Sequence, residues 1–200
     1  VEDVFNSFSL GIGADGVPGY PLIEAYLTGK ELKTVAEIDA SVSDLMTSAR
    51  LYMYGLQFTY NPHRMILNRV TDVYLLDADG NRRELEDDKL YRVVADLYSG
   101  QMLSAVTKTS YGLLSVVPKK ADGTPIENFE DVILTDNGGE LKAWTAIAHY
   151  MESFPDENGD GIADIPQYYA GLHERKVVDD SANLIKLIKN PNKYAVMIAE

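Results

Sequence analysis

The sequence predicts an α+β fold, in which a mixed β-sheet is flanked by helices. Short segments that alternate apolar and polar residues are typical of strands, and they are interspersed with segments of helical periodicity. The strict strand–helix alternation of a parallel sheet is missing. The 200 residues are 46% hydrophobic and 24% charged, as expected for a globular chain with a real core.

The charge and cysteine content exclude several classes of function. Acidic residues outnumber basic ones 31 to 18, which gives a net charge of -13, and the chain has no cysteine. A surface this acidic repels phosphate backbones and anionic lipid, so we expect neither a nucleic-acid partner nor membrane contact by this chain. A small phosphorylated ligand in a local pocket is compatible with this charge. Without cysteine there is no disulfide, thiolate nucleophile or zinc knuckle.

The first half predicts a glycine-rich loop, a strand, a helix and a meander. Gly11–Gly19 has the spacing of a dinucleotide fingerprint, but two prolines prevent the helix that must follow, so we expect a surface loop between two strands. Further expected elements are a strand at Leu22–Leu27, a helix that begins with a capping box at Thr28–Glu31 and runs to about Ala40, a short helical piece near Ser43–Ser48, and three strands of a meander, Leu56–Tyr60, Val70–Leu76 and Tyr91–Ala95, with a turn at Asp79–Gly80.

The second half mixes short strands with two clearer helices. The expected elements are a helix at Gln101–Thr107, strands at Leu113–Val117 and Val132–Leu134, a long amphipathic helix at Glu140–Ser153 and a helix at Ser181–Lys189. Lysines then precede an apolar run, Tyr194–Ala199. We interpret that run as a final strand or helix packing on the domain; the alternative is a juxtamembrane segment before a membrane anchor beyond Glu200.

No convincing catalytic centre is found in the sequence. His63, His149 and His173 lie far apart, and none belongs to a metal-binding or nucleophile-activating motif. The pattern that comes nearest to a metal site lies in the acidic stretch after Pro155. Asp156, Asn158, Asp160 and Asp164 occupy positions 1, 3, 5 and 9 of a calcium-loop spacing, with Gly161 at the turn. Position 12 is Gln167, so a structural Ca²⁺ site and a plain acidic turn both stay open.

Five stretches, in order, resemble the C-terminal domain of bacterial 5'-nucleotidases, a family that includes UDP-sugar hydrolases and 2',3'-cyclic-nucleotide phosphodiesterases. They are Asp3–Phe5 with Leu10–Gly11, Tyr26–Leu32, Gly55–Pro62, Asn68–Tyr74 and Asp88–Ala95. The resemblance covers about residues 3–155, so we expect a 5'-nucleotidase C-terminal-like domain over 1–155, incomplete at its N-terminus. Residues 156–200 would form the acidic loop and a helical extension.

The resemblance implies a function for the chain within a longer protein. In this family an N-terminal metallophosphatase domain holds two divalent metals, and the C-terminal domain binds the nucleoside part of the substrate. The D-x-H, G-D-x-x-D and G-N-H-E metal motifs are absent from this sequence. We therefore expect a hydrolase fragment that recognises nucleotides or related phosphoesters, is inactive alone, and belongs to an extracellular, cell-surface or periplasmic protein of nucleotide catabolism.

The resemblance also implies the binding residues. Two family aromatics sandwich the base, and their positions here match Leu10, followed by Gly11, and Tyr98, followed by Ser99. Tyr98 keeps a stacking face, whereas Leu10 does not, and an acid of the family is missing after Ser99. The alternative function is a noncatalytic cell-surface spacer or binding module on the same scaffold.

Overall fold

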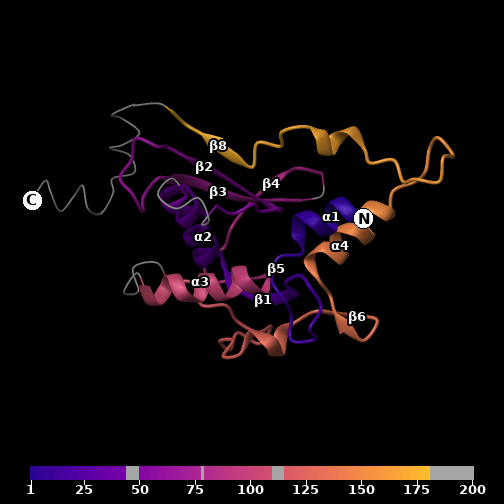
Figure 1. Cartoon of the computed structure of the whole chain (residues 1–200). Coiled ribbons are helices and arrows are strands. Elements are labelled where there is room, and N and C mark those ends of the chain that lie inside the picture. The colour runs from indigo at the N-terminus through magenta and orange to yellow at the C-terminus, as the bar shows by residue number, and fades with distance from the viewer. Residues whose placement is uncertain (44–49, 78, 110–114, 181–200) are drawn as a thin grey trace, which may run out of the picture. The chain divides into compact units, whose positions relative to one another are not determined.

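A computed structural model describes residues 1–43, 50–77, 79–109 and 115–180 (Figure 1). In chain order its elements are α1 (Glu2–Phe8), β1 (Leu22–Thr28), α2 (Gly29–Val42), β2 (Leu56–Tyr60), β3 (Val70–Leu76), β4 (Arg82–Glu84), β5 (Leu90–Asp96), α3 (Leu97–Thr109), β6 (Thr135–Asp136), β7 (Gly139–Glu140), α4 (Ala143–Glu152) and β8 (Lys176–Val178). Short 3₁₀ helices, Phe129–Val132 and Gln167–Ala170, complete the list. The chain divides into two compact units, which are described separately.

The first unit comprises residues 1–27 and 90–172 and is built around the pair of strands β1 and β5. Along β1, alternate residues are buried, as expected for a strand with one face in a core. Irregular segments bond to β1 as well: Tyr26 and Lys119 exchange both backbone hydrogen bonds, at 2.8 and 2.9 Å. Helices α1 and α4 pack together through an edge-to-face contact of Phe5 with Trp144, whose ring centroids lie 5.2 Å apart.

The second unit comprises residues 28–89 and 173–200 and contains a four-stranded sheet in the order β4-β3-β2-β8. The pairs β2–β3 and β3–β4 are antiparallel, whereas β2–β8 is parallel, so the sheet is mixed as predicted. Helix α2 packs against β3. Its predicted capping box is present, because the Thr28 hydroxyl accepts from the Glu31 N–H while the Glu31 carboxylate accepts from the Thr28 N–H.

Several predictions about the strands agree with the structure, but the expected meander of three strands is wrong. The bounds of β2 and β3 are as predicted, and Gly80, at φ +80°, makes the turn into β4. The third strand of the expected meander, β5, does not join β3; it pairs with β1 in the other unit's sheet. Alternation predicted β5 as a strand, but its partner β1 lies more than 60 residues earlier in the chain, outside the reach of local patterns.

The remaining differences between the predicted and observed elements lie where contacts with distant residues determine the ends of helices and strands. The glycine-rich loop follows helix α1 and not a strand, and α4 begins at Ala143 because Glu140 belongs to β7. Residues 129–132 form a 3₁₀ helix, so the expected strand at 132–134 is reduced to a single bridge between Ile133 and Ile23. Residues 115–117 carry no strand, although Val116 is buried.

Several expectations concern residues beyond those described. The helical piece at 43–48 falls almost entirely on them, as do the start of the strand at 113–117, the helix at 181–189 and the run 194–199. Within the described residues, no helix combines the length and apolar character needed to span a bilayer.

Candidate functional site

Tyr98 lies in the first turn of α3, directly after β5. The Leu97 N–H donates to the Pro21 carbonyl at 2.8 Å, which joins the start of α3 to the start of β1. The Asp96 carboxylate accepts from the Ser99 N–H at 2.9 Å and from the Ser99 hydroxyl at 2.6 Å, as a helix N-cap does. The backbone of Tyr98 is therefore held on both sides, while its side chain stays 46% exposed.

The ring of Tyr98 stacks on the ring of Tyr20. Their centroids lie 5.5 Å apart and their planes differ by 25°. Gly11 also borders the Tyr20 ring, since a Cβ at Gly11 would lie 2.4 Å from the ring carbon Cζ. Tyr20 was not among the predicted site residues. The sequence signal that could have found it is a tyrosine placed between the glycine-rich loop and β1.

The glycine loop (residues 11–19) places Leu10 and Gly11 beside Tyr20. The Tyr20 N–H donates to the Leu10 carbonyl at 3.0 Å, and the Gly19 N–H donates to the Gly11 carbonyl at 2.8 Å. Gly11 has φ +83°, a conformation that favours glycine. The Leu10 side chain is 79% exposed. The structure thus brings Leu10, Gly11 and Tyr98 together through Tyr20, and their contact with a substrate stays a prediction.

Ser99, the fourth predicted binding residue, lies next to Tyr98 but is engaged within the helix. Its hydroxyl donates to Asp96, so in this structure it stabilises the N-terminus of α3. Asp96 is the acid closest in sequence to Tyr98. Its carboxylate is occupied by the two bonds from Ser99.

A buried ion cluster fastens the tip of the glycine loop. Lys142, whose side chain is 3% exposed, donates to Asp15 at 2.7 Å and to Glu140 at 2.5 Å. Burial by itself would lower the pKa of the Lys142 ammonium, but these hydrogen bonds raise it above its ordinary value of 10.5. The bonds from the Lys142 ammonium and the Val17 N–H lower the pKa of Asp15 below 3.8. Sequence analysis missed this cluster because Asp15 and Lys142 lie 127 residues apart.

Two further contacts hold the same loop. The indole Nε1–H of Trp144 donates to the Pro18 carbonyl at 3.0 Å, and a Cβ at Gly19 would lie 2.6 Å from the Trp144 ring. A Cβ at Gly13 would lie 1.9 Å from the Glu140 carboxylate. The loop is therefore fitted to the residues that begin α4, and glycine is required where the backbone approaches them.

The predicted calcium loop folds around its own backbone. The Asp156 carboxylate accepts from the N–H groups of Gly159, Asp160 and Gly161 at 2.7 to 3.2 Å. The bond from Gly161, followed by those from Gly159 and Asp160, lowers the pKa of Asp156 below 3.8. Asp164 accepts from the Glu157 N–H at 2.8 Å.

The other two predicted ligands of this loop also cap nearby N–H groups. Asn158 accepts from Asp160, and Asp160 accepts from Ile162, at 2.9 and 2.8 Å. Across the part of the chain that the structure describes, no group of three or more His, Cys, Asp or Glu side chains is arranged to hold a metal ion. Binding of Ca²⁺ by the loop, with Asn158 as one ligand, stays a prediction.

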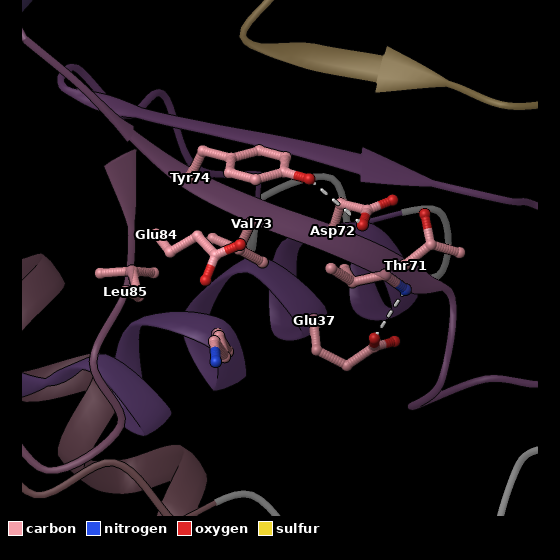
Figure 2. A pocket seen from close by; sticks show the side chains of 9 residues that line it. Glu37, Thr71, Asp72, Val73, Tyr74, Glu84 and Leu85 are labelled. Carbon is pink, nitrogen blue, oxygen red and sulfur yellow. Dashed lines mark hydrogen bonds between the residues drawn. The ribbon is translucent and has the colours of Figure 1, made fainter. Parts of the chain in front are cut away.

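A hollow of about 370 Å³ lies in the second unit, between α2 and the strands β3 and β4 (Figure 2). Carboxylates of Glu37, Asp72 and Glu84 line it. Glu37 accepts from the N–H groups of Arg69 and Val70, both at 2.8 Å, and from the Ser41 hydroxyl at 2.5 Å. Lys33, the cation of the hollow, donates to Asp87 at 2.6 Å. The bonds to Glu37 hold the start of β3 against α2, which is a structural role.

Comparison with known families confirms the resemblance. Residues 17–106 match the family described as "5'-nucleotidase, C-terminal domain". The segment includes α2 and the strands β1 to β5, and it contains both Tyr20 and Tyr98. No curated protein matches the chain.

The solved structure of a 5'-nucleotidase precursor supports the same fold. The chain resembles a 5'-nucleotidase precursor from Thermus thermophilus with a TM-score of 0.51 and 21% identity, covering 80% of this chain and 25% of that one. A comparison with the NAD nucleotidase of Haemophilus influenzae gives a TM-score of 0.39 and 21% identity over 56% of this chain and 18% of that one. The chain thus spans a quarter of the Thermus thermophilus protein, and the α+β fold is that of a 5'-nucleotidase C-terminal domain.

Proposed function

We propose that this chain is the substrate-recognition part of a multidomain, metal-dependent 5'-nucleotidase-like phosphohydrolase acting on nucleotides or related phosphoesters. The observation that carries the proposal is the exposed Tyr98 ring, held at the junction of β5 and α3 inside the family segment. An exposed aromatic ring on a fixed backbone is the kind of surface on which a base stacks.

The hydrolytic chemistry is assigned to a separate N-terminal metallophosphatase domain with two divalent metals. The described residues of this chain offer no cluster of metal ligands into which such a centre would fit. We therefore derive no chemical step within this chain. Its contribution would be to bind and orient the substrate, and the longer protein would act in an extracellular, cell-surface or periplasmic space.

The proposal is tested by separating binding from turnover. The 200-residue chain should bind AMP, adenosine or UDP-glucose in ligand-observed NMR, and it should release no phosphate from AMP in the presence of Mn²⁺. Protein that also contains the metallophosphatase domain should release phosphate under the same conditions. Clear turnover by the chain alone, or failure of the chain to bind all three compounds, would contradict the proposal.

Tyr98→Ala is the matched test of the site. Base–aromatic stacking contributes about 1–3 kcal/mol per base, so this variant should weaken AMP binding by roughly 5- to 150-fold. The melting temperature should change little because the side chain is 46% exposed. An equal loss of stability and binding would identify Tyr98 as a packing residue.

A further inference from the structure

Tyr98 offers only one of its two ring faces to a ligand, because Tyr20 stacks on the other. The centroid separation of 5.5 Å and interplanar angle of 25° leave no room for a third ring between the two side chains. Tyr98 remains 46% exposed with that face covered by Tyr20.

The backbone of Tyr20 is held by hydrogen bonds on both sides, and its ring borders the glycine loop. Its backbone N–H donates to the Leu10 carbonyl, and its carbonyl accepts from the Ala143 N–H at 3.1 Å. The ring borders Gly11, where a Cβ would come within 2.4 to 2.6 Å of three ring carbons. The position of the Tyr20 ring therefore depends on glycine at position 11 and on the anchored glycine loop.

The position that the family resemblance aligns with a second aromatic wall is Leu10, a 79% exposed aliphatic side chain. A single exposed ring can hold a ligand ring well only if its own plane is fixed, since ordering a free side chain on binding costs entropy. Stacking on Tyr20 removes that cost in advance.

We infer that Tyr20 is a positioning residue of the substrate site: it backs Tyr98 and fixes its ring plane, so that a planar ligand ring stacks on the opposite face of Tyr98. The inference rests on the proposed function. It makes the site an ordered stack of Tyr20, Tyr98 and ligand, with Gly11 giving the Tyr20 ring the space that it needs.

The test is a double-mutant cycle on AMP binding by the 200-residue chain. Tyr20→Leu removes the backing ring and should raise the dissociation constant roughly 2- to 10-fold, the range of an aromatic pair. Tyr20→Phe keeps the ring and should restore the affinity. In a Tyr98→Ala background, Tyr20→Leu should have no further effect, because its influence passes through Tyr98. Gly11→Ala, which displaces the ring, should weaken binding in the same direction.

Controls separate positioning from general stability. Tyr150→Leu removes a tyrosine from α4 of the same unit and should bind AMP like the wild-type chain; Tyr150 is 53% exposed, whereas Tyr20 is half-buried. The Tyr98 ring signals in NMR should shift on addition of AMP to the wild-type chain. Those signals should already be displaced in ligand-free Tyr20→Leu.

The outcomes distinguish the two proposals. If the wild-type chain binds AMP and Tyr20→Leu binds equally well or more tightly, the positioning role is wrong while the proposed function stands. An effect of Tyr20→Leu that persists unchanged in the Tyr98→Ala background also overturns it. If the wild-type chain binds none of AMP, adenosine and UDP-glucose, the proposed function fails, and the role of Tyr20 fails with it.

Discussion

The glycine loop (residues 11–19) and the acidic loop (residues 156–164) both contain glycine and aspartate, yet they are held in different ways. The glycine loop depends on partners far away in sequence, above all Lys142 and Trp144. The acidic loop is closed by bonds from its own N–H groups to Asp156 and its other oxygen-bearing side chains. One loop is therefore coupled to the fold around it, whereas the other can form by itself.

This difference matters for function. A loop that borders a binding surface must be placed accurately, and tertiary contacts do this for Gly11 and Tyr20. The oxygens of the acidic loop already accept N–H bonds from within the loop. A cation can therefore bind there or leave without disturbing the rest of the unit. Accordingly, the two loops should respond differently to mutation, cation and pH.

The largest expected effect is the loss of stability on replacing Lys142, because the glycine loop then loses its ion pair with that residue. Lys142→Met leaves the carboxylates of Asp15 and Glu140 without their cation, and we expect a loss of about 2–3 kcal/mol of unfolding free energy. This is less than for a fully buried pair, because the Asp15 side chain is 27% exposed. Denaturant unfolding measures it. AMP affinity should fall as well, since the loop borders Tyr20.

The control for that prediction is in the acidic loop. Asp164→Asn removes a charge from the same unit, but the hydrogen-bond partners of Asp164 are local, so it should cost much less stability and leave AMP binding unchanged. A smaller loss in Lys142→Met than in Asp164→Asn would show that the comparison of the two loops is wrong.

A second, smaller effect concerns calcium at the acidic loop. If Asp156, Asn158, Asp160 and Asp164 bind Ca²⁺, a free concentration ten times the dissociation constant should stabilise the fold by about 1.4 kcal/mol, seen as a rise in melting temperature. Asp160→Ala should abolish the rise, whereas Glu157→Gln, at a non-ligand position, should keep it. Absence of any calcium-dependent shift in the wild-type chain would leave a plain acidic turn.

The smallest effect is a difference between two carboxyl pKa values. Both Asp15 and Asp156 have lowered pKa values, the first owing mainly to Lys142 and the second mainly to the Gly161 N–H. In Lys142→Met, the pKa of Asp15 should rise toward 3.8 while that of Asp156 should not change. NMR titration of the side-chain carboxyl signals measures both. An unmoved Asp15 would mean that Lys142 does not govern its ionisation.

The same pKa shifts set the pH range over which the cluster stabilises the fold. A lowered carboxyl pKa contributes stability that is present above about 3.8 and is lost as the pH falls through the folded value. The raised pKa of Lys142 contributes stability that is present below 10.5 and is lost as the pH rises beyond it. The loss above pH 10.5 should be weaker in Lys142→Met than in the wild-type chain.

Sequence alone was sufficient for the elements whose signals are local. The capping box at Thr28 and Glu31, the strands β2 and β3 and the turn at Gly80 depend on residues within a few positions of one another. Alternation, capping and turn chemistry act over such short distances, so these elements were predicted correctly. The family resemblance, which rests on short stretches in order, was also visible at this level.

Only the tertiary structure decided which distant segments meet. Pairing of β5 with β1, the contact of Lys142 with Asp15 and the stacking of Tyr20 on Tyr98 join residues separated by tens of positions or more. The sequence was enough to predict Tyr98 as a site residue but not Tyr20. No local pattern shows which aromatic ring will cover a face of the Tyr98 ring. The physical reason is that such contacts are selected by burial and packing of the whole unit, where many partners of similar chemistry compete.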